Sequence, residues 1–105
     1  MEQIARTPSP PYYAVIFTSL RTSLESGYDD MAKRMVELAL AQPGFLGVES
    51  VREQLGITVS YWRSLEDIKN WKENAEHRIA QQYGREQWYS QFKTRIALVE
   101  RDYSF

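Results

Sequence analysis

The residue types best suited to chemistry gather between positions 60 and 89. His77, the only histidine, lies there and could act as a general base, because an imidazole titrates near neutral pH. Arg78 and Arg85 could clamp a carboxylate or an enolate by charge-assisted hydrogen bonds, and Tyr89 could donate to an oxyanion. Aromatic walls for a flat molecule are available from Trp62 and Trp88, and from Phe17 on an earlier strand. These residues predict a binding site for a small aromatic molecule.

Each of these residues also has an ordinary structural alternative. On an unbroken helix His77 faces away from the apolar stripe and would be solvated, whereas a bend near Asn74 would turn it toward a cleft. Trp62 and Trp88 stand at the ends of elements and suit a pocket wall or a packed core equally. Arg85 suits either a ligand clamp or a surface ion pair.

Composition excludes several classes of function. A chain of 105 residues forms one domain, and its net charge of −1 offers no attraction to a nucleic-acid backbone. Cysteine is absent and there is one histidine, so we expect no metal site and no cofactor. No apolar run reaches the length of a membrane span, and the N-terminus does not resemble a signal peptide. We therefore expect a soluble cytoplasmic protein without a membrane partner.

The hydrophobic pattern predicts six elements after a flexible, proline-containing arm at residues 1–11. Residues 12–20 and 91–103 alternate as strands, and residues 28–41 have the apolar spacing of a helix. Two strands, 45–53 and 57–63, are expected to form a hairpin through Gln54-Leu55-Gly56. Ser64 and Asp67 form the capping box of a second helix that ends near Gln82.

This order, strand–helix–strand–strand–helix–strand, predicts an α+β, ferredoxin-like βαββαβ domain over residues 12–105. Its four-stranded antiparallel sheet would carry both helices on one face. The first strand is apolar on both sides, with Tyr12 and Ile16 facing one way and Val15 and Phe17 the other. The face without helices needs a second apolar surface, so we expect a homodimer.

Several short motifs resemble the antibiotic biosynthesis monooxygenase domain family. They are Pro43-Gly44-Phe45, Tyr61-Trp62, Trp71, Glu76-His77-Arg78, Gly84-Arg85 and Trp88-Tyr89. The resemblance covers about residues 12–103 and implies a dimeric α+β barrel. Some relatives oxidise phenolic polyketides with oxygen and no cofactor, some degrade haem, and many have no assigned reaction.

On this resemblance, we expect the chain to bind and oxidise a phenolic or quinone-like molecule. His77 would be the base, Arg85 or Tyr89 would donate to the oxyanion, and the walls would be Phe17, Trp62 and Trp88. The alternative is a non-catalytic, ligand-binding or stress-related dimer of the same fold.

Haem binding fits the resemblance less well. Haem-degrading relatives use an asparagine on the first strand and a histidine about ten residues after a helix tryptophan. Here the strand position falls near Thr18 or Ser19, and the position after Trp71 is Gln81.

Overall fold

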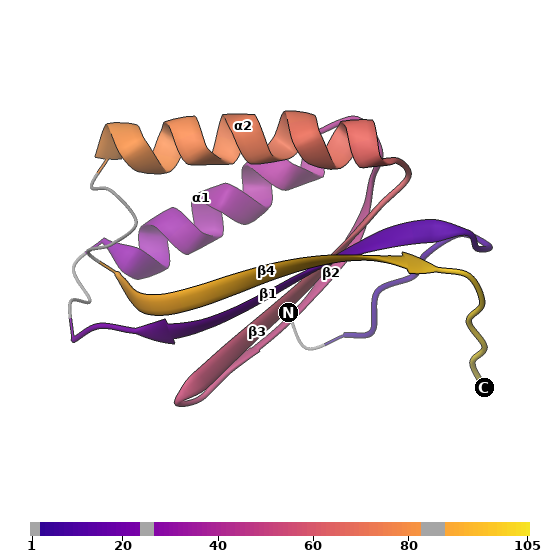
Figure 1. Cartoon of the computed structure of the whole chain (residues 1–105), viewed down its shortest axis with the longest axis horizontal. Coiled ribbons are helices and arrows are strands. Elements are labelled where there is room, and N and C mark those ends of the chain that lie inside the picture. Colours follow the sequence, from indigo (N-terminus) through magenta and orange to yellow (C-terminus); the bar gives the residue numbers. More distant parts are fainter. Residues whose placement is uncertain (1–2, 24–26, 83–87) are drawn as a thin grey trace.

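The computed structural model describes residues 3–23, 27–82 and 88–105, with the side chains of residues 76–82 left aside. The elements are β1 (Tyr12–Arg21), α1 (Tyr28–Leu40), β2 (Phe45–Arg52), β3 (Leu55–Trp62), α2 (Leu65–Gln82) and β4 (Tyr89–Val99). The strands form one antiparallel sheet in the order β2-β3-β1-β4. Both helices lie on the same face of this sheet (Figure 1). The predicted ferredoxin-like βαββαβ fold is therefore confirmed.

Strand register assigns each side chain to one face of the sheet, because directly paired residues point the same way. Trp62 stacks on Trp71 of α2, so its row faces the helices. Its partner Tyr13 and the alternate residue Phe17 belong to this helix face. Tyr12 belongs to the opposite, open face. The alternation predicted for the first strand is confirmed.

The β2–β3 hairpin is tighter than the sequence indicated. β3 begins at Leu55, and Gly56 pairs with Arg52 of β2 and with Ser19 of β1. The expected connection Gln54-Leu55-Gly56 is therefore wrong: the turn occupies Glu53 and Gln54. Gly56 looked like a turn residue because glycine commonly marks turns, but here it lies within a paired strand.

The last strand spans Tyr89–Val99 and not the predicted 91–103. At its end, Val99 pairs with Tyr12, the first residue of β1, and Pro11 precedes it. Residues beyond Val99 thus have no further β1 residue with which to pair. The strand ends where its neighbour begins.

The start of α2 is fixed by the predicted capping box. The Ser64 hydroxyl accepts from the Asp67 backbone N–H at 3.1 Å and donates to the Asp67 carboxylate at 2.8 Å. Gly44, in the turn between α1 and β2, has φ +80° and lies against this same carboxylate. The turn and the helix start therefore pack as one unit.

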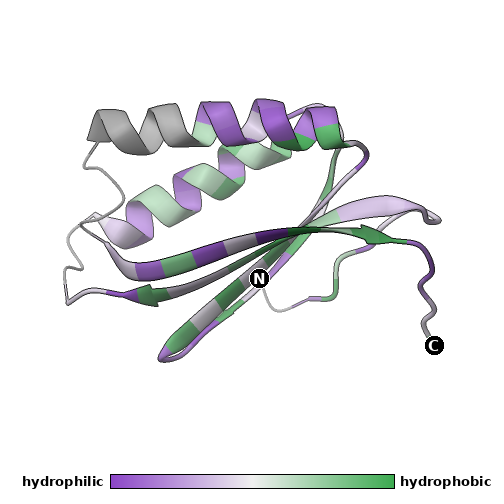
Figure 2. Cartoon of the chain, viewed as in Figure 1, coloured by the Kyte–Doolittle hydropathy of each residue, from purple (hydrophilic) through white to green (hydrophobic). Residues whose placement is uncertain are grey.

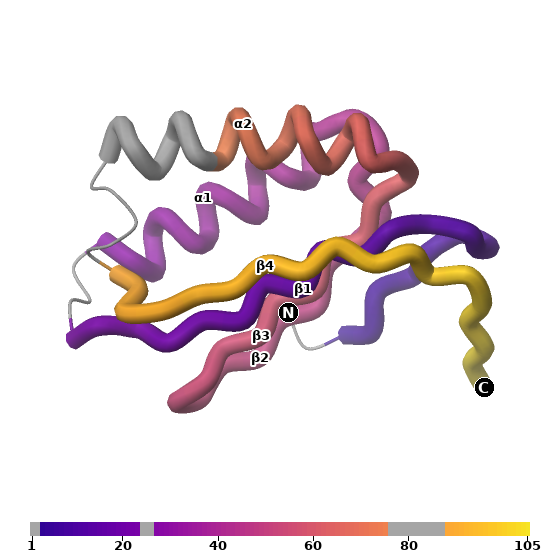
Figure 3. The backbone as a smooth tube through the Cα atoms, in the orientation of Figure 1, coloured from indigo at the N-terminus to yellow at the C-terminus, as the bar shows by residue number. Residues whose placement is uncertain are grey.

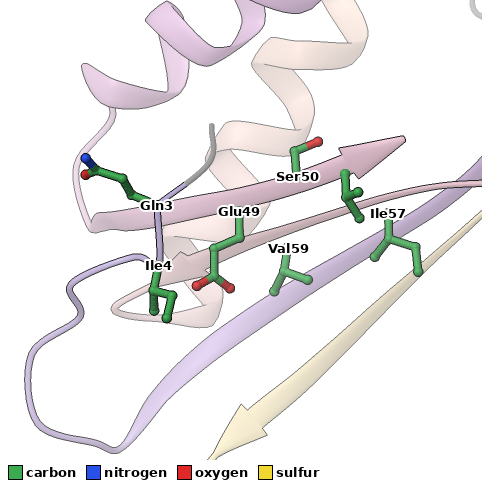
Figure 4. Close-up of a pocket in the computed structure, with 7 residues that line it drawn as sticks. Gln3, Ile4, Glu49, Ser50, Ile57 and Val59 are labelled. Carbon is green, nitrogen blue, oxygen red and sulfur yellow. The ribbon is translucent and has the colours of Figure 1, made fainter. Parts of the chain in front are cut away.

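The N-terminal arm lies on the open face, against β2. The backbone N–H of Ala5 donates to the Glu49 carboxylate at 2.9 Å, and the Tyr61 hydroxyl donates to the same carboxylate at 2.6 Å. Figure 4 shows Glu49 beside Ile4 of the arm. Together with neighbouring β2 and β3 residues, they line a shallow hollow of about 260 Å³.

Apolar side chains remain exposed on the open face and along β4. On the open face, Val51 is 65% exposed and Leu55 is 49% exposed. β4 is an edge strand, and its helix-face residues Phe92, Ile96 and Leu98 are also exposed. Figure 2 shows hydrophobic and hydrophilic residues mixed along the strands. In the part of the chain that the structure describes, no helix is long and apolar enough to cross a membrane.

Candidate functional site

Aromatic side chains form two separate groups on the helix face. The first joins Trp62 to Phe45, with ring centroids 5.3 Å apart, and to Trp71, with centroids 6.0 Å apart. Trp62 has no exposed surface, and its indole N–H donates to the Ser60 hydroxyl at 2.9 Å. This geometry favours a packing role for Trp62, fixing α2 against β3.

The second group, here called the aromatic cluster, consists of Phe17, Tyr28, Trp88, Tyr89 and Phe92. Phe17 contacts Tyr89 and Phe92 at centroid distances of 5.3 and 5.5 Å. Tyr28 meets Trp88 and Tyr89 edge-on, at 6.0 and 5.9 Å. The cluster joins the end of β1, the start of α1 and the start of β4. Its rings pack against one another in tilted and edge-to-face contacts, the arrangement that aromatic side chains favour.

Two tyrosine hydroxyls meet inside the aromatic cluster. The hydroxyl oxygens of Tyr28 and Tyr89 lie 3.2 Å apart, within hydrogen-bond distance. Burial, followed by this hydrogen bond, raises the pKa of Tyr89, while the nearby positive charges of Arg52 and Arg21 oppose the rise. At neutral pH the Tyr89 hydroxyl is therefore protonated and can donate a hydrogen bond.

Two arginines border the aromatic cluster. The guanidinium carbon of Arg21 lies 3.5 Å from the centroid of the Tyr28 ring, a cation–π arrangement. Arg52 donates from Nη2 to the hydroxyl of Ser19, which is 1% exposed. Figure 3 shows that the end of the β2–β3 hairpin, near Arg52, extends away from both helices. Two arginine side chains thus lie beside the cluster, one over a ring of α1 and one reaching it from the β2–β3 hairpin.

Sequence reasoning missed both arginines and Tyr28. Arg52 falls within the predicted strand 45–53, and Arg21 directly follows the predicted strand 12–20. The available signal was the strand alternation, which placed Arg52 on the same side as Val48 and Ser50. Following that alternation to the β1 partner would have led to Ser19.

The predicted site residues are only partly brought together. Phe17, Trp88 and Tyr89 meet in the aromatic cluster, where Trp88 is 2% exposed. Trp62 pairs with Tyr13, four residues before Phe17, which places it roughly 13 Å away at ~3.3 Å per residue. Arg85 lies outside the described residues. His77 lies in α2, but its side chain is outside the described part.

The cluster's polar groups determine which chemistry it can support. One hydroxyl of the Tyr28–Tyr89 pair, a serine hydroxyl and a guanidinium can donate hydrogen bonds to an anionic oxygen. Among the described residues, no group of three carboxylate or imidazole side chains could hold a metal ion. The described part of the site is suited to holding an aromatic ring and stabilising negative charge on its substituent.

Comparison with known proteins gives one close relative and several structural neighbours. The chain is 50% identical over 107 residues to the uncharacterized protein YqjZ of Bacillus subtilis (strain 168), covering all of this chain and 94% of YqjZ. Its structure is similar to that of PA3566 from Pseudomonas aeruginosa, with a TM-score of 0.67 and 17% identity over 91% of this chain and 99% of the other.

A further neighbour is SnoaB, a cofactor-independent oxygenase from Streptomyces nogalater. The TM-score is 0.61 at 9% identity, over 90% of this chain and 97% of SnoaB, so the likeness is one of fold. Residues 11–83 match the sequence profile described as antibiotic biosynthesis monooxygenase. This match spans more than half of the chain and includes β1, α1, β2, β3 and α2. The chain therefore belongs to the antibiotic biosynthesis monooxygenase family.

Proposed function

We propose that the protein is a cofactor-independent monooxygenase that binds and oxidises a phenolic or quinone-like aromatic molecule. The observation that carries the proposal is the aromatic cluster, in which Phe17, Trp88 and Tyr89 meet beside two hydroxyl groups. Family membership supports a monooxygenase-type function, and the fold is shared with a cofactor-independent oxygenase.

In this reaction the substrate supplies the electrons. A base removes a proton from an anthrone or phenol, and the resulting carbanion forms a carbon–oxygen bond with O₂. Loss of water then breaks the oxygen–oxygen bond, so one oxygen atom enters the product and the other leaves as water. An anthrone and O₂ thus give an anthraquinone and water.

The residues contribute positioning, proton transfer and charge stabilisation. The ring of Phe17 would contact the substrate, with the buried Trp88 packed behind Tyr28, and the protonated Tyr89 hydroxyl would donate to its developing oxyanion. His77, on α2, is the proposed base, and Arg85 is a second proposed donor. Both assignments derive from the sequence and the family resemblance.

The polar groups of the aromatic cluster also suit a second candidate function, binding without catalysis. Its described polar groups can all donate at neutral pH, including Tyr89, whose raised pKa keeps the hydroxyl protonated and therefore unable to accept a proton from a substrate. A site of donors stabilises a ligand that is already ionised. This favours a non-catalytic, ligand-binding dimer as the alternative.

Oxygen consumption distinguishes the two functions. We expect the protein to accelerate O₂ uptake by an anthrone above the uncatalysed blank, with one anthraquinone formed per O₂ consumed. Catalase should release no oxygen, because water and not peroxide is the second product. Tryptophan fluorescence that changes on adding the anthrone, with uptake no faster than the blank, would support the alternative. If neither oxygen uptake nor tryptophan fluorescence changed, both proposed functions would be contradicted.

We also propose that two copies associate through the open faces of their sheets. Exposed Val51 and Leu55 lie there, and burying apolar area stabilises association by about 25 cal/mol per Å² before the costs of ordering. The N-terminal arm already occupies part of this face at Glu49. A second copy would therefore pack against the arm as well as the sheet.

A further inference from the structure

A row of four residues crosses the helix face of the sheet, one from each strand. In sheet order it reads Arg52, Gly56, Ser19 and Phe92. Neighbouring strands lie roughly 5 Å apart, so Phe92 stands one strand beyond Ser19, which Arg52 reaches from the other side. The row therefore places a cation and an aromatic ring within the span of one small aromatic acid.

Gly56 allows the Arg52 side chain to lie flat across the sheet. A Cβ atom at Gly56 would be 2.2 Å from both Cζ and Nη2 of Arg52, so the guanidinium fills the space of the missing side chain. This arrangement brings Nη2 to the buried hydroxyl of Ser19. The cation is thus directed along the row toward β1 and away from the hairpin turn.

The Arg52 guanidinium is incompletely satisfied. Its Nη1 atom is buried and has no hydrogen-bond acceptor among the described residues. No described carboxylate pairs with it either; Ser19, a neutral hydroxyl, is its described partner. A buried donor left without an acceptor is costly, and more so when charged. Arg52 as a whole stays partly exposed, so another part of its side chain meets solvent although Nη1 does not.

We infer that Arg52 binds the anionic oxygen of an aromatic acid whose ring packs against Phe17 and Phe92. The two rings lie 5.5 Å apart, and 40% of Phe92 remains exposed on the same face as the guanidinium. The inference rests on the proposed function, since both use the aromatic cluster. It goes further by naming the ligand class: aromatic molecules that carry a carboxylate or an ionised phenol.

A pair of ligands of equal shape tests the inference in the full-length protein. 2-Naphthoate carries a carboxylate, and 2-naphthamide is its neutral counterpart. Calorimetric titration should show about tenfold to a hundredfold tighter binding of the naphthoate, the range expected for hydrogen bonds to a charged group. The preference should shrink as salt concentration rises.

Two variants of the row should remove this preference without removing ring binding. Arg52→Met keeps the side chain's length without its charge, and we expect equal affinity for the two ligands. Gly56→Ala keeps the charge but displaces the guanidinium, and we expect the preference to fall severalfold. Arg34→Met, which removes an exposed cation from α1, is the matched control and should bind as the unchanged protein does. Circular dichroism and thermal melting establish that each variant is folded.

The possible outcomes separate this inference from the proposed function. Equal affinity of the unchanged protein for the two ligands would overturn the inference alone. A preference for the naphthoate that survives in folded Arg52→Met would also overturn the inference. Folded Arg52→Met that binds neither ligand would overturn it too, because Arg52 would then act structurally. If the unchanged protein bound neither ligand, aromatic binding at the cluster and the inference would both fail. If Arg52→Met does not fold, the test is the preference for the naphthoate in Gly56→Ala: a severalfold fall supports the inference, and an unchanged preference overturns it.

Discussion

The hydroxyl oxygens of Tyr28 and Tyr89 lie 3.2 Å apart and join the start of α1 to the start of β4. We predict that Tyr89→Phe lowers the free energy of unfolding by about 0.5–1.5 kcal/mol, the usual loss for one hydrogen bond. Urea denaturation measures this change. Oxygen uptake should fall further than stability explains, because the donor to the oxyanion is lost. Tyr103→Phe, at an exposed position, is the control.

Stability should decline at high pH because folding raises the pKa of buried tyrosines. Burial, followed by hydrogen bonding, raises the pKa of both Tyr61 and Tyr89 above the ordinary value of 10.0. Below pH about 10 both states keep these protons, so the contribution is fully present. Above pH 10 the unfolded chain releases them first, and stability falls as the pH rises toward the folded-state pKa.

Urea denaturation between pH 8 and 11 measures this decline. Tyr61→Phe and Tyr89→Phe should each make the fall above pH 10 less steep, since each removes one linked proton. If stability fell as steeply above pH 10 in both variants as in the unchanged protein, these tyrosines would not control the loss of stability at high pH.

His77→Ala should lower turnover about 10²- to 10⁴-fold, the usual contribution of a general base, without changing the melting temperature. Oxygen uptake with an anthrone measures turnover. Lys69→Ala, at an exposed position on the same helix, should leave the rate unchanged. Unchanged turnover in His77→Ala would remove this residue from the mechanism.

Gly44→Ala should destabilise the fold by about 2–3 kcal/mol, combining an unfavourable left-handed backbone with a steric clash. The backbone has φ +80°, and an added Cβ would lie 2.0 Å from the Asp67 carboxylate. Urea denaturation of Gly44→Ala, Asp67→Ala and the double variant separates the two causes. The double variant should lose less stability than the single variants together. Strict additivity would argue against the clash.

Light scattering tests the proposed dimer. We expect a mass of about 25 kDa at micromolar concentration, twice the 12.3 kDa of one chain. Val51→Asp places a charge on the open face and should shift the mass toward that of one chain. Glu37→Gln, exposed on α1, should leave the mass unchanged. A single-chain mass for the unchanged protein would contradict the association.

Local patterns in the sequence were sufficient to predict the fold. The alternating faces of β1 and the Ser64–Asp67 capping box depend on neighbours along the chain, so periodicity and spacing reveal them. The role of Gly56 depends on a side chain from another strand, and local rules therefore indicate a turn. The contact between Ala5 and Glu49 spans 44 residues, and nothing in the arm's own sequence specifies it.

The candidate site was predictable to the extent that it consists of aromatic residues. Phe17 and Tyr89 could be selected because rings on apolar faces tend to pack together. Residue type alone could not separate Trp62 from these two residues. Only the strand register shows that Trp62, at the end of β3, lies beside the start of β1. Arg52 enters the site through cross-strand pairing, which a single sequence does not fix locally.

The position of β4 at the sheet's edge affects how the chain behaves when crowded. This 11-residue strand has side chains exposed along most of its length, including Phe92, Ile96 and Leu98. The outer backbone of an edge strand is a template on which another extended chain can add. Lys93 and Arg95 interrupt the apolar residues and repel a like-charged strand. Neutralising both would open a route to fibrous aggregation along β4.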